Sequence, residues 1–365
     1  LSIAGKPVLQ YVIEALAQAG SRNLVLVAGY RREQIFDYFG SGEQFGVNIN
    51  YVTQEKQLGT ANALAQAKRL VEEEFLVLAG DKLIEASTIA QFVNIKPEAV
   101  LVKRVENPYR HGLVEVEGSL VKSIVEPPAE PKTNIVTTRI YAFSKEIFDY
   151  LDSDLIISTA LNKMIAQGKP VYAYETDGPW LDIVYPWDIL SLNALILHQV
   201  KPSLSGFIEK GVSLKGRVSI GKDAVIRANS TIVGPVVIGD GCEIGPNACI
   251  LPATSIGDSV VISPFCVVQA SVIGSDVNIG SGSTIQDSVI DRGCVIGVHF
   301  TACSGEAHVQ INHEHHLVKM GAMLGEACNI GSCVIAQPGV IVGNYIQVQS
   351  LKTISGRLPD KSLVL

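Results

Sequence analysis

The sequence predicts an α/β domain over residues 1–200, followed by a parallel β-helix over residues 207–365. Two observations predict this fold class. Apolar segments alternate between strand-like and helix-like periods as far as residue 200, and beyond it apolar residues recur at every sixth position. Residues 201–206, KPSLSG, have the composition of a linker. A chain of 365 residues is long enough for each domain to bury its own core.

The first domain alternates helices with strands. Helical spacing is found at 7–20, 32–40 and 58–71, and short apolar runs typical of strands at 23–30, 48–54 and 74–81. This alternation predicts a mostly parallel sheet with helices on both faces, which binds ligands at the carboxyl ends of its strands. A last helix is expected over 186–200, with Asp188 in its first turn, where the positive end of the helix dipole favours an acid.

The period of six runs through positions 208, 214, 220, 226, 232, 238, 244, 250, 256, 262 and 268, all of them aliphatic. Neither a strand nor a helix explains this spacing, which is typical of a parallel β-helix whose aliphatic residues point inward. A small core residue is expected four places after each aliphatic one. The residues that fit are Ala224, Ser230, Cys242, Ala248, Thr254, Cys266, Cys294 and Cys328.

Composition narrows the class of protein. The net charge of −7 argues against nucleic acid and anionic membranes as partners. No apolar run approaches the roughly 20 residues that span a bilayer, and the first residues do not have the pattern expected of a secretory signal. The 7 cysteines are odd in number and form no CxxC pair, so a zinc ribbon or a disulfide scaffold is not expected. Reduced thiols predict a cytoplasmic protein.

QEKQLGTANAL at 54–64 lies at a strand–loop–helix junction. The side chains of Gln54 and Gln57 each offer a donor and an acceptor, which suits the amide edge of a pyrimidine. Gly59 permits close approach of the backbone, and the helix start at Thr60 favours phosphate. The alternative is an ordinary helix start without a ligand.

Two aspartates are candidates for a metal site. Asp81 ends the strand LAGD, and Asp182 lies among large apolar residues in PWLDIVYPWDIL. A carboxylate at a strand end can hold Mg²⁺ against a triphosphate, and a second carboxylate can complete the site. The alternatives are a helix cap for Asp81 and a salt bridge for Asp182.

Taken together, these motifs resemble the sugar-1-phosphate nucleotidylyltransferases over nearly all of the first 200 residues. The order is GKPVLQYVIEAL, QLGTA, GD, HGLVEV, VEPP, RIYAF and WLDIVYPWD. The resemblance implies a Rossmann-like domain that transfers a nucleotidyl group from UTP or dTTP to a sugar 1-phosphate and releases pyrophosphate. It implies that Asp81 and Asp182 are catalytic and hold Mg²⁺. Nucleotide-binding roles fall on Gln54, Gln57, Gly59 and Thr60, and sugar-binding roles on Gly112, Glu126, Thr137 and Arg139.

The sequence departs from the family at three places. The glycine-rich phosphate loop of the family is expected before Leu1. Glu126-Pro127-Pro128 stands where the family has Glu-Lys-Pro. Thr137-Thr138-Arg139 replaces Asn-x-Gly, and Arg139 either supplies a replacement charge or blocks the sugar pocket. We therefore expect altered sugar specificity.

The six-residue repeat resembles the left-handed β-helix of the hexapeptide acyltransferases, which implies a homotrimer. With the first domain, it resembles the archaeal bifunctional sugar-1-phosphate nucleotidylyltransferase/acetyltransferases, so acetyl-CoA is a possible second substrate. However, Ser281, Leu251 and Gln269 stand where those enzymes carry His, Arg and Lys. Two alternatives to simple nucleotidyl transfer therefore stay open: additional acetylation of an amino-sugar phosphate, and a non-catalytic homologue that binds sugar nucleotides as a regulator or scaffold.

HVQINHEHH at 308–316 lies in a loop insertion near residues 299–320. Apolar residues on both sides of NHEHH predict a hairpin that leaves the β-helix and has a solvated tip. The alternative is that His299 or His308 serves as a relocated base at an acyl site. A metal site is disfavoured because successive residues on one strand point to opposite faces.

Overall fold

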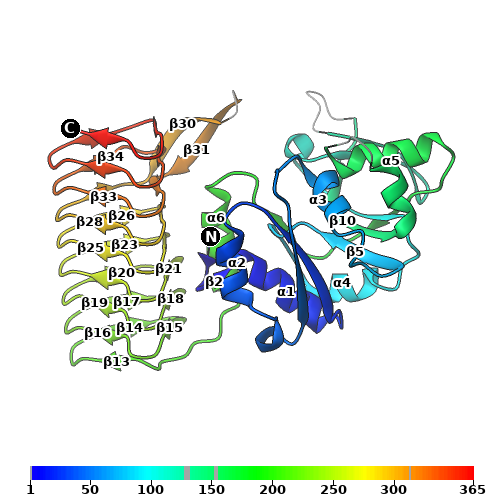
Figure 1. Cartoon of the computed structure of the whole chain (residues 1–365). Helices are drawn as coiled ribbons and strands as arrows, with labels where there is room; N and C mark the ends of the chain where they lie inside the picture. Colours follow the sequence, from blue (N-terminus) through cyan, green and yellow to red (C-terminus); the bar gives the residue numbers. More distant parts are fainter. Residues whose placement is uncertain (1, 127–131, 152–154, 312–313) are drawn as a thin grey trace. The chain divides into compact units, whose positions relative to one another are not determined.

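The computed structural model describes residues 2–126, 132–151, 155–311 and 314–365 (Figure 1). The chain divides into two compact units. The α/β unit is Val8–Asp182, and the β-helix unit joins Leu1–Pro7 to Ile183–Leu365. The sequence pattern groups residues 183–200 with the first domain, whereas their packing groups them with the β-helix.

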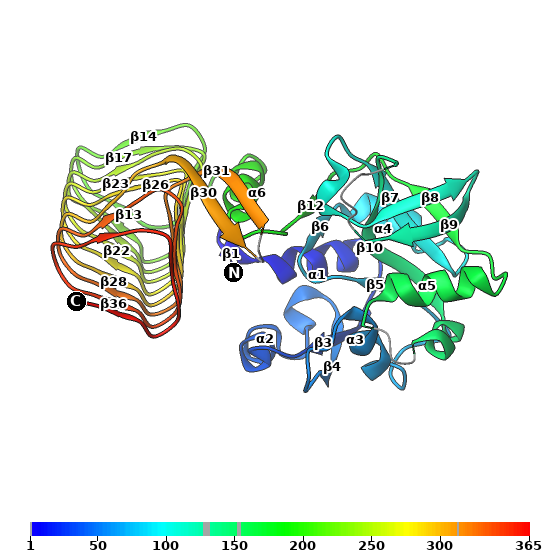
Figure 2. The same ribbon diagram turned by 90° about the horizontal axis from the view of Figure 1, so that it is seen from above.

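The main sheet of the α/β unit has six strands. Their order is β5 (Glu74–Leu78), β10 (Ile135–Ser144), β7 (Ala99–Arg104), β11 (Tyr172–Glu175), β9 (Leu120–Val125) and β8 (Leu113–Glu117) (Figure 2). Two smaller sheets pair β3 (Asn23–Ala28) with β4 (Asn48–Thr53) and β6 (Lys82–Ile84) with β12 (Trp180–Asp182).

The expectation of a mostly parallel sheet is wrong for this main sheet. Only β7 and β11 pair in parallel within it, and β10 is antiparallel to both β5 and β7. For β8 and β9 the cause is local: the two residues Gly118 and Ser119 join them, and so short a connection can only join antiparallel strands. The parallel pairing that was expected is found between β3 and β4.

Helices cover both faces of the main sheet, as predicted. The α-helices of this unit are α1 (Val8–Gln18), α2 (Arg32–Phe39), α3 (Thr60–Gln66), α4 (Ala86–Phe92) and α5 (Ile157–Ala166), and the 3₁₀ helices are η1 (Glu43–Phe45), η2 (Pro108–Arg110) and η3 (Lys145–Tyr150). Val100 of β7 packs in one core with Leu161 of α5, and the next residue, Leu101, packs in another with Ile13 of α1. This alternation follows from the period of two in a strand.

The β-helix unit stacks its strands in three parallel sheets. The first contains β13 (Phe207–Ile208), β16 (Val225–Ile226), β19 (Glu243–Ile244), β22 (Val261–Ile262), β25 (Asn278–Ile279), β28 (Val295–Ile296), β33 (Asn329–Ile330), β36 (Gln347–Val348) and β39 (Leu363–Val364). The second contains β14 (Ser213–Lys215), β17 (Thr231–Val233), β20 (Cys249–Ile250), β23 (Val267–Gln269), β26 (Thr284–Gln286), β29 (Thr301–Ala302), β34 (Ile335–Ala336) and β37 (Thr353–Ile354). The third contains β15 (Val218–Ile220), β18 (Val236–Ile238), β21 (Thr254–Ile256), β24 (Val272–Ile273), β27 (Val289–Ile290), β32 (Ala322–Leu324), β35 (Val340–Val342) and β38 (Arg357–Leu358).

The predicted repeat positions form the core of this unit. Ile220 to Val268 are buried at every sixth position, and Ile208 and Leu214 pack against the same core while partly buried. The eight small residues expected between them are also buried, including Cys242, Cys266, Cys294 and Cys328. Cysteine acts here as a compact apolar side chain. All seven cysteines are free thiols.

A hairpin and a helix complete the β-helix unit. The strands β30 (Gly305–Ile311) and β31 (Glu314–Met320) pair antiparallel, which confirms the predicted hairpin, while His313 lies outside the described residues. The helix α6 (Asp188–Leu197) begins with Asp188, as predicted, and the short strands β1 (Ser2–Ile3) and β2 (Lys6–Pro7) pair with each other. Among the described helices, none is long and apolar enough to cross a membrane.

The histidines of this hairpin differ in their surroundings. His316 is not part of a solvated tip, because its ring packs 4.3 Å from the ring of Tyr185 and 5.6 Å from that of Trp187. Its side chain is only 21% exposed. His308, on the facing strand, is exposed. The expectation of a solvated tip is therefore wrong for His316, since aromatic packing gives its ring a partner that no local pattern reveals.

Candidate active site

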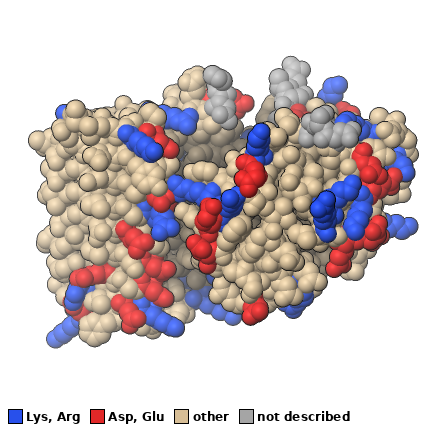
Figure 3. All heavy atoms as spheres, viewed as in Figure 1, with Lys and Arg blue, Asp and Glu red and all other residues tan. Residues whose placement is uncertain are grey.

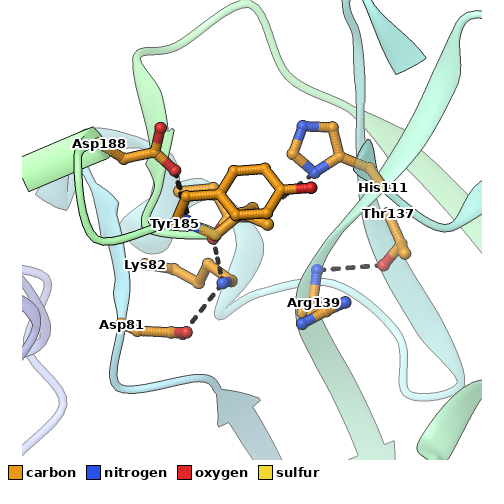
Figure 4. Close-up of polar contacts among 9 residues, drawn as sticks. Asp81, Lys82, His111, Thr137, Arg139, Tyr185 and Asp188 are labelled. Atoms are coloured by element: carbon orange, nitrogen blue, oxygen red, sulfur yellow. Dashed lines mark hydrogen bonds and ion pairs between the residues drawn. The ribbon is translucent and has the colours of Figure 1, made fainter. Parts of the chain in front are cut away.

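The two predicted aspartates of the α/β unit share one partner, Lys82. Its Nζ lies 3.0 Å from Oδ1 of Asp81 and also contacts Oδ1 of Asp182 (Figure 4). The other carboxylate oxygen of Asp182 lies 3.4 Å from Nδ1 of His111. The strand pair β6–β12 creates this cluster, because Lys82 and Asp182 stand opposite each other in its register. Sequence positions 100 residues apart thus become neighbours.

The three charged side chains differ in how far solvent reaches them. The side chains of Lys82 and Asp182 are 2% and 7% exposed, whereas that of Asp81 is 53% exposed. Burial alone would raise the pKa of Asp182, but hydrogen bonding to His111 and the charge of Lys82 outweigh it and lower the pKa below its ordinary value. Asp182 is therefore an ionised, fully paired carboxylate, and Asp81 is the one that solvent reaches.

The cluster does not fit a divalent ion held by both aspartates. An oxygen-bound Mg²⁺ needs ligands at about 2.1 Å, in a place that here belongs to the ammonium group of Lys82. Among the described residues, no group of three or more His, Cys, Asp or Glu side chains is arranged around a metal position. The prediction that Asp81 and Asp182 hold Mg²⁺ together therefore rests on the family resemblance alone.

The predicted sugar-binding residues lie together. Gly112 accepts a backbone hydrogen bond from Thr137 at 2.9 Å, and a Cβ on Gly112 would lie 3.0 Å from the Thr137 methyl group and 3.8 Å from Oε1 of Glu126. The backbone N–H of Arg139 donates to Oγ1 of Thr137 at 3.0 Å (Figure 4). Arg139 has a positive φ of 60°, in the irregularity that interrupts β10 between Thr137 and Ile140.

Two further residues join this group without having been predicted. Ser158, at the start of α5, donates from Oγ to Oε1 of Glu126 at 2.6 Å. Tyr141 is buried in β10, and burial raises the pKa of its phenol. A hydrogen bond with Thr137 and the charge of Arg139 act in the opposite direction, while the charge of Glu126 adds to the increase. No sequence pattern marks a serine in a helix as a site residue, so Ser158 is identified only by its hydrogen bond with Glu126 in the structure. Pro127 and Pro128, of the VEPP motif, lie outside the described residues.

A cavity of about 1070 Å³ connects these groups. Asp81, Glu126 and Arg139 line it, and so do the whole of β3 and the whole of β5. Among the strands that the structure describes, β3 pairs only with β4, and β5 pairs only with β10. Both β3 and β5 therefore have one free edge. The cavity therefore combines a polar end with a long slot between two strand edges.

The loop before α3 is held by the glutamine predicted to bind a base. The amide nitrogen of Gln54 donates to the carbonyl of Gly59 at 3.1 Å and to Oδ1 of Asn62 at 2.9 Å. Gln57 is exposed and packs over Gly29, where a Cβ would meet its amide nitrogen at 2.7 Å. Thr60 lines the cavity and accepts from the backbone N–H of Ile157 at 3.2 Å.

The close approach expected at Gly59 is made by the protein itself. At a φ of 112°, a Cβ on Gly59 would overlap the backbone carbonyl of Leu155. The loop 55–59 is thereby fixed to the segment before α5. A glycine here is needed for internal packing, whichever ligand the loop meets.

In the β-helix unit, Ser281 and His299 lie on successive coils. The backbone N–H of His299 donates to the carbonyl of Ser281 at 2.9 Å, and the exposed His299 has a positive φ of 55°. Its ring covers Gly282, where a Cβ would lie 2.5 Å from Nδ1. A histidine thus stands one coil away from Ser281, the position at which the resemblance to the acetyltransferases predicts a base.

This α/β fold, with its cavity of carboxylate, arginine and hydroxyl groups, joined to a parallel β-helix, defines a nucleotidyltransferase with a hexapeptide-repeat domain. The family described as Nucleotidyl transferase matches residues 1–199, and the chain belongs to it. Residues 214–317 match the family described as GMPPB C-terminal domain.

Curated relatives match along all or part of the chain. A protein named "Bifunctional protein GlmU" from Methanococcus maripaludis is 32% identical, covering 100% of this chain and 91% of its own length. A bifunctional sugar-1-phosphate nucleotidylyltransferase/acetyltransferase from Sulfurisphaera tokodaii is 30% identical over 95% of this chain and 89% of its own. A glucose-1-phosphate thymidylyltransferase from Streptomyces griseus is 29% identical over 64% of this chain and 69% of its own.

Proposed function

We propose that the protein transfers a nucleotidyl group from UTP or dTTP to a sugar 1-phosphate, giving an NDP-sugar and pyrophosphate. One observation supports this most: Asp81, Glu126 and Arg139 line a single cavity in the domain that matches the nucleotidyl transferase family. The relative named "Bifunctional protein GlmU" and the relative named as a thymidylyltransferase match at similar identity, 32% and 29%, so the proposal keeps both nucleotides.

In the proposed reaction, a phosphate oxygen of the sugar 1-phosphate attacks the α-phosphorus of the NTP in line, and the bond to pyrophosphate breaks. Little covalent chemistry falls to the protein in such a transfer, so positioning and charge neutralisation dominate. We assign the guanidinium group of Arg139 to the anionic phosphate of the sugar. The carboxylate of Glu126, held by Ser158, would accept hydrogen bonds from sugar hydroxyls near Gly112 and Thr137.

For the nucleotide, we propose a division of labour between the two glutamines. The amide nitrogen of Gln54 is used to hold the loop, so Gln54 shapes the base pocket and leaves its oxygen as an acceptor. Gln57 is exposed and offers both donor and acceptor to the base. Gly59 and Thr60 would meet the ribose and phosphates at the start of α3.

A phosphate-binding segment would complete this site. The free edges of β3 and β5 and the slot between them suit one further parallel strand, since each edge presents unpaired backbone groups. We propose that the glycine-rich loop of the family follows such a strand and brings its backbone amides to the cavity at Asp81.

We further propose a cytoplasmic homotrimer formed through the β-helix. The free thiols support a reducing compartment. The second β-helix sheet supports self-association, because its outward column is uncharged: Thr231, Cys249, Val267, Thr284, Thr301, Ile335 and Thr353. Such a column is suited to packing against copies of itself. On the face of the molecule that Figure 3 shows, the β-helix also carries a broad area without Lys, Arg, Asp or Glu.

Acetyl transfer from acetyl-CoA to an amino-sugar phosphate is the second candidate function. The observation that favours it is the exposed ring of His299, one coil from Ser281. A positioned histidine can deprotonate an amine. The exposed His308 is the other candidate for this role. Release of free thiol from acetyl-CoA with amino-sugar phosphates tests it, and a rate that His299→Ala and His308→Ala leave unchanged would exclude both residues.

Pyrophosphate exchange tests the leading proposal. Labelled pyrophosphate should enter UTP or dTTP only when a matching NDP-sugar is present. Glu126→Gln and Arg139→Ala should lower the exchange rate by about 100-fold, as expected for positioning groups. Glu117→Gln is the control, because Glu117 pairs with Lys122 at the distal end of β8. Absence of exchange with every nucleotide and sugar would favour the non-catalytic regulator or scaffold instead.

A further inference from the structure

Lys82 is a buried lysine, with only 2% of its side chain exposed. A buried ammonium group is costly unless it is paired, and this one has two carboxylate partners. It contacts Oδ1 of Asp182 and lies 3.0 Å from Oδ1 of Asp81. Its position between the two predicted metal ligands therefore satisfies its charge and occupies the space between them.

The backbone fixes this arrangement. Lys82 is the first residue of β6 and follows Asp81 directly in the chain. On the partner strand β12, Asp182 is its register partner. Directly opposed residues of an antiparallel pair hold their side chains within contact distance. Strand pairing therefore places the ammonium group of Lys82 beside the carboxylates, and rotation of the Lys82 side chain cannot easily remove it.

The remaining oxygen of Asp182 is also taken. Nδ1 of His111 lies 3.4 Å from it, and the ring of His111 packs edge-on against that of Trp180, with centroids 5.0 Å apart. Trp180 lies on the same strand as Asp182, two residues earlier. Both oxygens of Asp182 thus face protein groups from β6 and from the segment before β8, and neither points into open solvent.

We propose that Lys82 is the resident cation of this site: its ammonium group stands in place of a divalent metal between Asp81 and Asp182, and the pair binds no divalent ion of its own. This proposal rests on the proposed function only for identifying the cluster as the active site. It adds that Asp81, whose side chain is 53% exposed, is the one aspartate of this pair that stays open to solvent.

The test is titration with Mn²⁺ alone, in the absence of nucleotide and sugar, with the free ion followed by electron paramagnetic resonance. The wild-type protein should show no Mn²⁺ site that depends on Asp182. Lys82→Met should create one Mn²⁺ site, with an affinity at least about tenfold higher than any Mn²⁺ binding by the wild-type protein. The reason is that removal of the ammonium group leaves two carboxylates facing each other. Adding Asp182→Asn to Lys82→Met should abolish that site.

Lys103→Met is the matched control, since Lys103 is also partly buried in the α/β unit but its Nζ donates to a carbonyl, that of Gly178, at 2.7 Å. It should leave Mn²⁺ binding unchanged. If Lys82→Met does not fold, Asp182→Asn in the wild-type background decides alone: a loss of Mn²⁺ affinity there would overturn the proposal, and unchanged binding supports it. Pyrophosphate exchange is measured separately, so failure of the proposed function is distinguishable.

Discussion

Gly59 and Leu155 are in backbone contact, although nearly a hundred positions separate them in the chain. At the φ of 112° that Gly59 adopts, a Cβ would overlap the Leu155 carbonyl. The contact ties the loop after β4 to the segment before α5. The N–H of Ala61, in α3, donates to the same Leu155 carbonyl at 3.2 Å. The predicted nucleotide loop, although exposed, is therefore anchored to the rest of the α/β unit.

Replacing Gly59 with alanine should destabilise the α/β unit by about 2–4 kcal/mol, because steric overlap is added to backbone strain. The free energy of unfolding in urea measures this. Gly168→Ala is the control: its φ is 79°, but a Cβ there would meet nothing within 4 Å, so only about 1 kcal/mol is expected. Equal losses in both variants would show that the contact with Leu155 has no energetic role.

Asn193→Ala should destabilise the β-helix unit. The fully buried amide of Asn193 accepts from the N–H of Ala4 at 2.9 Å and donates to the carbonyl of Ala253 at 2.9 Å. Its removal leaves both backbone groups unpaired, at a cost of about 2–4 kcal/mol. Calorimetric unfolding of the variant checks this. The exposed Asn94, in the turn after α4, donates to the carbonyl of Ala90 at 3.2 Å, and Asn94→Ala should cost less than about 0.5 kcal/mol.

Stability should depend on pH through Glu98. Its carboxylate accepts from the backbone N–H and Oγ of Ser144 at 3.0 and 2.6 Å, while Oε2 is buried without a partner among the described residues. Burial raises the pKa of Glu98 above its ordinary value of 4.5. The folded state therefore holds this proton more tightly than the unfolded state does. The resulting stability is complete below the unfolded pKa and is lost as the pH rises through the folded pKa.

Glu98→Gln should accordingly stabilise the protein, relative to wild type, more at about pH 7 than at about pH 4. Urea midpoints at the two pH values give the comparison. Glu115→Gln is the matched control, because the exposed Glu115 accepts a hydrogen bond from Oγ of Ser123 at 2.7 Å without being buried. A Glu98→Gln effect that is independent of pH would argue against a raised pKa.

Ile335→Lys should convert the proposed trimer to monomers. Ile335 is 49% exposed on the uncharged column of the second β-helix sheet, and burial of an unpaired ammonium group at an interface is prohibitive. Molar mass from light scattering after size-exclusion chromatography measures the change. Val295→Lys is the control, since Val295 is also 49% exposed but lies on the first sheet. A wild-type mass of one chain would contradict the proposal directly.

Much of the site followed from short motifs. Asp81, Glu126 and Arg139 come from three separate motifs, and the fold brings all three into the lining of one cavity. The strand directions in the main sheet could not be predicted from the motifs: β10 lies between β5 and β7 and is antiparallel to both. Apolar runs that look alike in sequence do not reveal which partner, or which direction, a strand will take.

By itself, the sequence determined the two architectures, the core positions of the β-helix and the hairpin near 308–316, because these features depend on periods that are repeated locally. Only the tertiary structure decided what surrounds Asp182. Lys82 and His111 reach it from positions 100 and 71 residues away, through the register of β6 with β12 and the packing of His111 on Trp180. Charge pairing at such separations has no period. It arises from strand register and burial, and these exist only once the chain has folded.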